Sequence, residues 1–160
     1  MRLGTALQAL LDCAETQLAD AGRTVPDHVF VSPGQVAFDE RCGQLWVRVI
    51  RGYPTTDPPN QTDIVRPCTY PIYMQVGLGI IRCQTGINHL DQDEYPTADE
   101  QTTDALGLIC DQGALYRAMF CCDTSPGEEA LPHIANPEWT QIEPQGGVIG
   151  GEWTAWIEAD

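Results

Sequence analysis

Lysine is absent from this sequence, and basic residues of any kind are few. Eight arginines stand against 23 aspartates and glutamates, which leaves a formal net charge of -15 at pH 7. Binding the phosphates of a nucleic acid requires a positive patch, and these arginines are scattered along the chain. A lysine-dependent phosphate-binding loop is excluded as well. We therefore expect no specific binding to DNA, and solubility alone is a sufficient reason for the acidic balance.

Long apolar runs are also missing. No window approaches the ~20 apolar residues that cross a membrane, and the apolar stretch that follows Arg2 is interrupted by Asp12 and Glu15. The sequence therefore predicts a protein that is neither secreted nor embedded in a membrane. Its apolar content of 42% is typical of a folded chain, and its 160 residues suit a single domain over residues 1–160.

Groups that carry chemistry are sparse and far apart. The histidines, His28, His89 and His133, show no metal-binding spacing, and the seven cysteines include no Cys-x-x-Cys pair. Cys121 and Cys122 come at the end of a predicted helix, where the helix dipole disfavours a thiolate. We predict no catalytic residue, no metal site and no cofactor. Most cysteines are expected to be buried thiols, with one or two disulfides formed outside a reducing cell as the alternative.

Apolar periodicity predicts the first elements of the fold. Apolar residues recur at steps of three and four over residues 3–20, which indicates an amphipathic helix that ends at Gly22. Short strands are expected at residues 28–31 and 35–38, and a stronger strand at residues 44–50. These segments alternate with turn residues, as strands of one sheet do.

The middle of the chain combines a long loop with a strong strand. Prolines at residues 52–71 predict a flexible loop that contacts a neighbouring molecule. The strand at residues 72–82 is apolar on one face, and its other face carries two glycines, which weaken a strand unless another segment packs closely there. We interpret that face as a close-approach surface, with a bulge or bend as the alternative. The loop and this face supply the candidate interface residues Tyr53, Pro58, Pro59, Ile64, Gly77 and Gly79.

A long helix is predicted in the second half. Thr97 and Glu100 form a capping box that starts a helix over residues 98–122. The apolar stripe of this helix is expected to cover the sheet, and it consists of Ala105, Leu108, Ile109, Ala114, Leu115, Ala118, Met119 and Cys122.

The end of the chain is predicted to return to the sheet. A flexible irregular passage at residues 123–138 precedes strands at residues 139–142 and 153–158, and a glycine-rich turn at residues 146–151 joins them. The whole order predicts the α+β class, with a mostly antiparallel sheet, an N-terminal helix and one long helix packed on one face.

Several of these segments carry a resemblance to a known group of proteins. They are residues 36–39, 42–48, 81–83, 103–118 and 146–154, and together they are spread over residues 34–157. Through them the chain resembles the small neck and tail-terminator proteins of long-tailed bacteriophages of actinobacterial hosts. The segments are packing and turn motifs without catalytic content. The absence of lysine also fits a GC-rich genome.

The resemblance implies a structural virion protein of the phage neck or tail, assembled in the host cytoplasm, and not an enzyme. It would form a homo-oligomeric ring, typically a hexamer, at the head-proximal end of the tail. There it would end tail-tube growth and join the tail to the neck. The implied partners are further copies of itself, the major tail-tube protein and the neck connector or stopper protein, while DNA passes through without specific binding.

A flexible loop at residues 84–96 contains a cluster of carboxylates, Asp91, Asp93 and Glu94. In a ring this cluster is repeated once per subunit, and we expect it to form a negative collar that repels the phosphates of passing DNA. The alternative is that the loop lies on the outer rim, where its charge is simply solvated.

Other functions stay open at this stage. A head-to-tail stopper or connector ring is equally small and acidic, although stoppers tend to be β-barrels and this chain has two helices. A small enzyme or metal-binding domain is a further alternative, with Cys42, Cys68, His28 and His89 as candidate site residues. A cellular structural adaptor without phage origin is the last.

Overall fold

The computed structural model of the chain describes residues 3–36, 43–61, 70–86, 95–122, 134–145 and 147–159. Its two helices are α1 (Leu3–Asp20) and α2 (Ala98–Cys121). Its five strands are β1 (His28–Ser32), β2 (Gln44–Pro54), β3 (Ile72–Cys83), β4 (Ile134–Gln145) and β5 (Val148–Ala159). Along the chain these elements follow the order α1, β1, β2, β3, α2, β4, β5.

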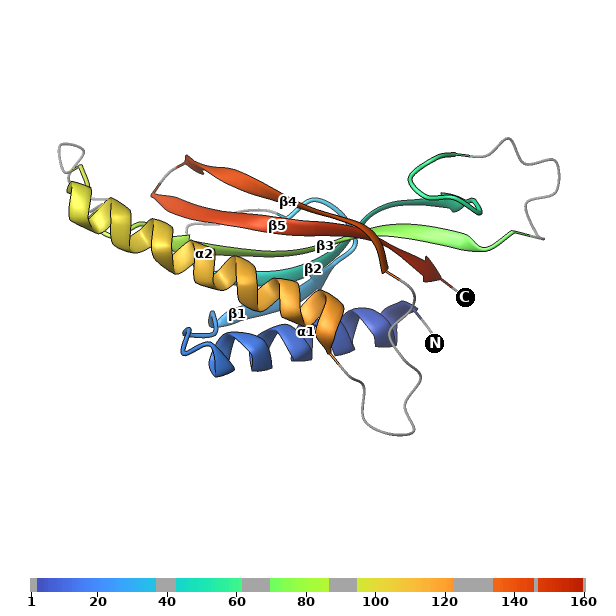
Figure 1. Ribbon diagram of the computed structural model, residues 1–160, viewed down its shortest axis with the longest axis horizontal. Helices are drawn as coiled ribbons and strands as arrows, with labels where there is room; N and C mark the ends of the chain where they lie inside the picture. Colours follow the sequence, from blue (N-terminus) through green and yellow to red (C-terminus); the bar gives the residue numbers. More distant parts are fainter. Residues whose placement is uncertain are drawn as a thin grey trace.

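The described strands form one open sheet in the order β1-β2-β3-β5-β4 (Figure 1). β1 runs parallel to β2, and the other neighbours are antiparallel. Both helices lie on the same face, where α1 contacts β1 and β2 while α2 contacts β3 and β5. The α+β class predicted from the sequence, with both helices on one face of a mostly antiparallel sheet, is therefore confirmed.

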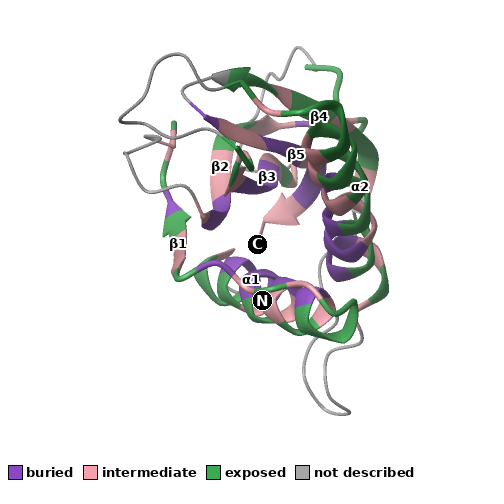
Figure 2. Ribbon diagram, turned by 90° about the vertical axis from the view of Figure 1, so that its left-hand side faces the viewer, coloured by how far each residue is buried: buried purple, intermediate pink, exposed green. Residues whose placement is uncertain are grey.

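The hydrophobic core lies between the two helices and the sheet (Figure 2). Alternation along β3 places Val76, Leu78 and Ile80 on the helix side, and all three are fully buried. They pack against the apolar faces of both helices, formed by Leu7, Leu10, Leu11, Ala14, Leu18, Ala114, Leu115, Ala118 and Met119. None of the helices in the described part of the chain is long and apolar enough to span a membrane.

Both predicted helices are present, and their ends follow the expected signals. α1 covers the predicted residues 3–20, and Gly22 adopts a φ of 68°, the left-handed conformation that stops a helix. α2 begins with the predicted capping box, because the Thr97 side chain accepts a hydrogen bond from the backbone N–H of Glu100. The Glu100 carboxylate accepts one from the Thr97 backbone N–H at 2.8 Å.

The predicted orientation of α2 is wrong for two residues. Ala105 is exposed, and 61% of Ile109 is accessible to solvent, although both were expected to face the sheet. The reason is Asp111, a polar residue that lies in the middle of the buried arc and is fully inaccessible. Placing Asp111 inside turns Ile109 to the opposite side of the helix.

The early strands differ from prediction in extent. Gln35 and Val36 are not in a strand, and the remainder of the strand expected at residues 35–38 lies outside the described residues. β2 continues to Pro54, so the loop expected from residue 52 begins later. Thr55 is fully buried and its hydroxyl donates to the carbonyl of Asn60 at 2.7 Å, which makes the start of this loop an ordered turn.

The last two strands are much longer than predicted. β4 begins at Ile134, inside the passage expected to be irregular, and β5 begins at Val148. Gly147 has a φ of 79° in the turn between them, whereas Gly150 and Gly151 lie within β5. Local composition hid these strands because β4 is an edge strand, where proline and polar residues are tolerated.

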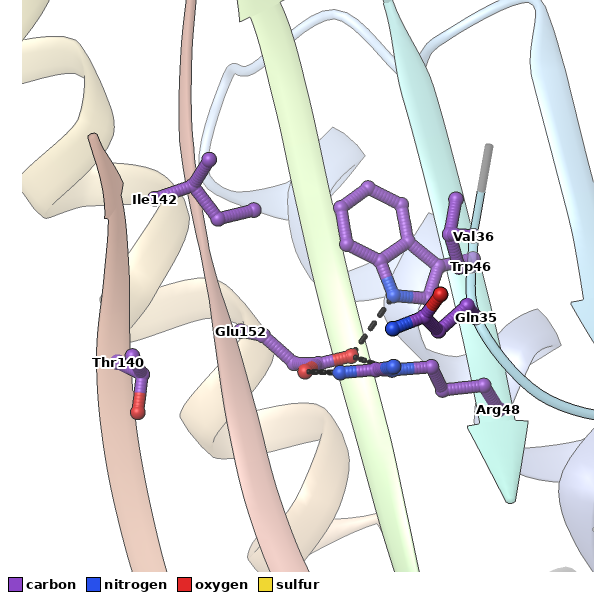
Figure 3. Close-up of a pocket in the computed structure, with 7 residues that line it drawn as sticks. All are labelled: Gln35, Val36, Trp46, Arg48, Thr140, Ile142 and Glu152. Atoms are coloured by element: carbon purple, nitrogen blue, oxygen red, sulfur yellow. Dashed lines mark hydrogen bonds and ion pairs between the residues drawn. The ribbon is translucent and has the colours of Figure 1, made fainter. Parts of the chain in front are cut away.

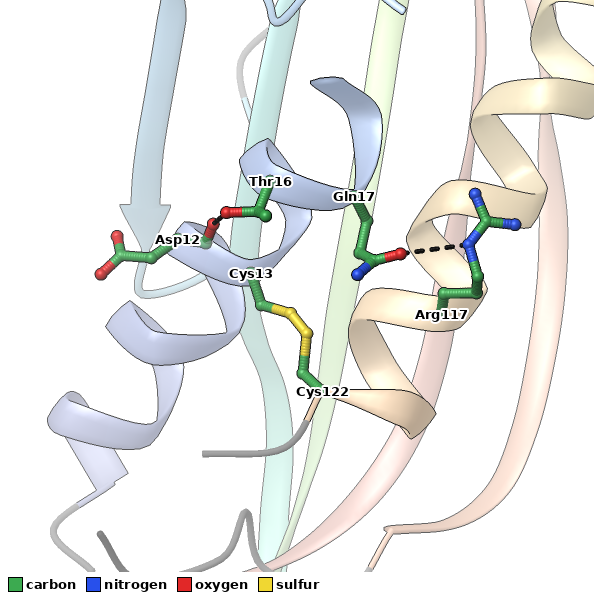
Figure 4. The surroundings of a disulfide bond; sticks show 6 residues. All are labelled: Asp12, Cys13, Thr16, Gln17, Arg117 and Cys122. Carbon is green, nitrogen blue, oxygen red and sulfur yellow. Dashed lines mark hydrogen bonds between the residues drawn. A yellow bond between two sulfur atoms is a disulfide. The ribbon is translucent and has the colours of Figure 1, made fainter. Parts of the chain in front are cut away.

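The cysteines in the described part of the chain are not the buried thiols that we expected. Cys13 in α1 forms a disulfide with Cys122, the residue that follows α2 (Figure 4). Cys83 is also disulfide-bonded. Cys110 and Cys121 are free and exposed. The alternative of one or two disulfides is therefore the correct one for the described cysteines, and the bond between Cys13 and Cys122 joins the two helices across 109 residues of sequence.

The core packing of α2 can be tested with charge substitutions. Leu108→Asp or Leu115→Asp should leave insoluble protein, because burying an unpaired charge costs several kcal/mol, about the whole stability of a domain. Ile109→Asp is the matched control on the same helix and should stay soluble and folded, as judged by circular dichroism. A soluble, folded Leu115→Asp variant would contradict the orientation described for α2.

The disulfide between the helices should contribute a large part of the stability. Closing a loop of about 100 residues stabilises a fold by up to about 5 kcal/mol, so Cys13→Ser should lower Tm by on the order of 10 °C. Cys110→Ser is the control and should melt like the wild type, because Cys110 is free. With a reducing agent, the wild type and Cys13→Ser should melt together. Equal Tm values without the reducing agent would show that the bond does not form in solution.

Candidate functional site

The sheet face opposite the helices carries a hollow of about 410 Å³ (Figure 3). The residues that line it come from the segment after β1 and from β2, β4 and β5. They are Gln35, Val36, Trp46, Arg48, Thr140, Ile142 and Glu152. Gln35 and Glu152 are 117 positions apart in the sequence, so only the tertiary structure brings these residues together.

Strand register explains why the hollow forms over β3. Trp46 of β2 and Glu152 of β5 both pair with Gly79, the β3 residue between them. The Trp46 ring lies over Gly79, and the Glu152 carboxylate lies over Gly77. A Cβ at either glycine would come too close to those side chains for any real contact. The glycines therefore leave a trough in which side chains from the two flanking strands meet.

Glu152 accepts three hydrogen bonds in this trough (Figure 3). Trp46 Nε1 donates to Oε1 at 2.8 Å, Arg48 Nε donates to Oε1 at 2.7 Å, and Arg48 Nη2 donates to Oε2 at 2.5 Å. Only 6% of Glu152 and 1% of Trp46 are exposed. The hydrogen bond to Glu152 and the attraction of its charge raise the pKa of Arg48 above its ordinary value, against the lowering effect of burial.

The contacts of Glu152 with Trp46 and Arg48 join strands β5 and β2. Both oxygens of Glu152 are already acceptors in a two-pronged ion pair, an arrangement that favours precise positioning. Nucleophilic or acid–base catalysis would need a side chain beside a group able to exchange its proton, and the described residues that line the hollow do not provide such a pair. Glu152 thus links β2 to β5 across β3.

A second buried carboxylate stabilises the helix face. Asp111 of α2 is fully inaccessible and accepts from Arg23, which follows α1, at 2.7 Å and 3.3 Å. It also accepts from Arg82 of β3 at 2.5 Å and 2.9 Å. The hydrogen bond to Asp111 raises the pKa of Arg23. The sequence analysis missed both carboxylates, although a lone acid within the apolar arc of α2 was a signal for Asp111.

The glycine face is covered by the chain itself. Gly77 and Gly79 were candidate interface residues, but Glu152 and Trp46 of the same chain lie against them. The only irregularity in the pairing of β2 with β3 falls between Val49 and Arg51, so a bulge at the glycines is not the explanation either. The predicted close approach to this face is therefore present, and the side chains that make it belong to the same chain.

The candidate interface residues at the far end of β2 also make contacts within the chain. Tyr53 donates its hydroxyl to the carbonyl of Pro59, and its ring centre lies 5.0 Å from that of Trp156. The carbonyl of Pro58 accepts from Asn136 Nδ2 at 2.7 Å, which ties this turn to β4. Pro59 is exposed. Whether these residues touch a neighbouring subunit stays a prediction.

Other predicted site residues fall outside the described part of the chain. These are Ile64, the acidic residues Asp91, Asp93 and Glu94, and the candidate ligands Cys42, Cys68 and His89. His28 is described, and its ring packs edge-on against Phe30 at 4.9 Å. Among the described residues, no group of three or more His, Cys, Asp or Glu is placed to hold a metal ion.

Every described arginine is engaged by a group of its own chain. Arg23 and Arg82 bind Asp111, and Arg48 binds Glu152. Arg51 donates to Gln75 and lies over the Trp156 ring, and Arg117 donates to Gln17. The exposed acidic residues of the described ranges are Asp12, Asp20, Asp27, Asp57, Asp99, Glu138 and Glu143. The described surface is therefore dominated by negative charge.

A single methyl group added at Gly79 should lower the stability of the fold. Gly79→Ala should lower the free energy of unfolding by about 1–3 kcal/mol, because the added Cβ meets the buried Trp46 ring. Gly34→Ala is the control, since no heavy atom lies within 4 Å of a Cβ there. Urea denaturation measures both. A Gly79→Ala protein as stable as Gly34→Ala would show that the ring does not lie over Gly79.

No protein-family model and no curated protein sequence matches this chain. Its function must therefore follow from its own charges, surfaces and contacts.

Proposed function

We propose that this protein is a structural component of a phage virion that forms a ring at the head-proximal end of the tail. The ring ends growth of the tail tube and joins the tail to the neck. The sequence resemblance to tail-terminator and neck proteins is the starting point. The function needs contact surfaces and a DNA-repelling charge, and it needs no catalytic group.

The placement of the arginines is the observation that carries this proposal. A protein around a DNA channel must let a polyanion pass without adhering. Here the described arginines are bound within the chain, and Arg23, Arg48 and Arg82 have carboxylate partners. The exposed charges of the described surface are mainly carboxylates. Such a charge balance on the described surface disfavours phosphate binding.

The open sheet favours a tail terminator over a stopper ring. Stoppers tend to be β-barrels, and a barrel requires the first and last strands of the sheet to pair. In the described chain β1 and β4 lie at opposite edges and do not pair with each other. The collar role of Asp91, Asp93 and Glu94 stays a prediction within this proposal.

Ring formation and control of tube length test the proposal together. The purified protein, alone or with the major tail-tube protein, should form closed rings visible by electron microscopy. Increasing amounts should shorten the tubes that the tube protein builds, because a bound ring blocks one end. Light scattering measures the mass of the ring in the same samples.

Monomers at every concentration, with and without tail-tube and neck proteins, together with unchanged tube lengths, would overturn the proposed function. Leu115→Asp is unsuitable as a negative control because it should not fold, so bovine serum albumin at matched concentration controls for nonspecific effects on tube growth.

A further inference from the structure

Helix α2 is apolar on two opposite faces. Its inner face packs Leu108 and Leu115 against the sheet. Its outer face carries Leu106, Ile109 and Tyr116, which are 59%, 61% and 44% exposed. These three residues are spaced by three and seven positions and therefore form one stripe along the helix, the outer stripe of α2. Tyr116 leans from this stripe against Trp153 of β5, with ring centres 5.3 Å apart, whereas Leu106 and Ile109 are the most exposed large apolar residues of the helix.

The part of α2 that follows residue 104 carries no exposed carboxylate. Between residues 105 and 122 the only acidic residue is Asp111, which is buried between two arginines, and the only basic residue is Arg117. The chain as a whole has 23 acidic residues. Two copies, each with a formal charge of -15, repel one another least where such a surface makes the contact.

A complementary surface lies on the opposite flank of the molecule. Figure 2 shows β1 and α2 on opposite sides, and α1 lies between them along the lower edge. β1 is at the edge of the sheet and pairs only with β2 among the described strands. Val31 in β1 is 41% exposed, and the exposed Asp27 immediately precedes the strand. This edge offers an unpaired strand, an apolar side chain and a carboxylate.

We infer that the outer stripe of α2 is one half of the contact between subunits, and that the β1 edge of the next copy is the other half. The inference rests on the proposed ring. Eight residues of helix separate Ile109 from Arg117, about 12 Å along the axis. Val31 lies in β1 and Asp27 just before it, four residues away, which is about 13 Å at the rise of a strand. Packing Ile109 on Val31 thus brings Arg117 to the Asp27 of the neighbour.

The charges on this contact are complementary. Arg117 uses Nε to bind Gln17 at 3.1 Å, and its two terminal nitrogens have no partner among the described residues. Asp27 of the next copy supplies the carboxylate for them. The pair fixes the direction and register of the contact, which apolar packing alone does not.

This contact joins two different surfaces, so after pairing one copy keeps a free β1 edge and the other keeps a free α2 stripe. Repetition closes a ring when the rotation between copies allows it. A contact of α2 with α2 would instead be symmetric and would stop at a dimer. The two arrangements predict different products for variants that block one surface.

Two variants block the two surfaces separately. Ile109→Asp blocks the helix surface, and Val31→Asp blocks the strand surface. Each should be a folded monomer by circular dichroism and light scattering. Their equimolar mixture should form a one-to-one dimer and nothing larger, because one intact surface of each kind remains. Thr16→Asp, an exposed site on α1, adds the same charge as a control and should still form rings.

The charge pair has its own test. Arg117→Glu should weaken ring assembly, and combining it with Asp27→Arg should restore assembly because the pair is reversed. Asp27→Arg alone should also weaken assembly. Failure of the double variant to assemble better than the two single variants would overturn the proposed register.

The remaining outcomes separate this inference from the proposed function. Rings of Ile109→Asp or Val31→Asp alone would overturn the inferred contact and leave the ring itself standing. Dimers of Val31→Asp alone would indicate the symmetric helix contact and would also overturn it. A wild-type protein that never assembles, even with the tail-tube protein, would contradict the proposed function as well. If Ile109→Asp does not fold, Ile109→Ser replaces it in the mixture.

Discussion

The buried carboxylate of Asp111 determines how α2 lies on the sheet. It accepts hydrogen bonds from Arg23 after α1 and from Arg82 of β3, and so it joins three elements that are distant in the chain. Removing one partner of such a buried pair costs about 3–5 kcal/mol, because a charge is left without compensation. With Asp111 held inside, Leu108 and Leu115 face the core and Ile109 faces outward. Both the hydrophobic core and the exposed stripe depend on this orientation.

Glu152 plays the corresponding part on the other face of the sheet. It joins β2 to β5 above the two glycines of β3, through Trp46 and Arg48. Together the two carboxylates engage three of the five described arginines. The structural role of these arginines therefore has an electrostatic consequence for the surface. Carboxylates neutralise these three arginines, so the exposed charges of the described surface are mainly acidic.

An acidic surface with one uncharged stripe suits a protein that assembles with copies of itself beside DNA. Negative charge keeps the nucleic acid from adhering and also opposes contact between subunits. Repulsion is weaker at the outer stripe of α2, because the only acid within residues 105–122, Asp111, is buried and neutralised. The terminal nitrogens of Arg117, which have no partner among the described residues, add attraction at the end of the stripe. Within the proposed ring, one helix thus provides core packing on one side and subunit contact on the other.

The sequence by itself determined the elements that depend on local patterns. The periodicity of residues 3–20, the capping box at Thr97 and the alternation in β3 each predicted an element that the structure contains. These signals involve residues within a few positions of each other, where helix and strand geometry act directly. The acidic charge and the α+β class followed from the same level of information.

Only the tertiary structure decided which residues meet. The Trp46–Glu152 hydrogen bond spans 106 positions, the Cys13–Cys122 disulfide spans 109, and Arg82 reaches Asp111 across 29. No local pattern encodes such pairs. The glycines of β3 were visible in the sequence, but the side chains that lie over them come from β2 and β5 and depend on strand register. The sides to which Ile109 and Asp111 turn likewise depend on two arginines outside the helix, because hydrophobicity alone would have placed the aspartate in solvent and the isoleucine in the core.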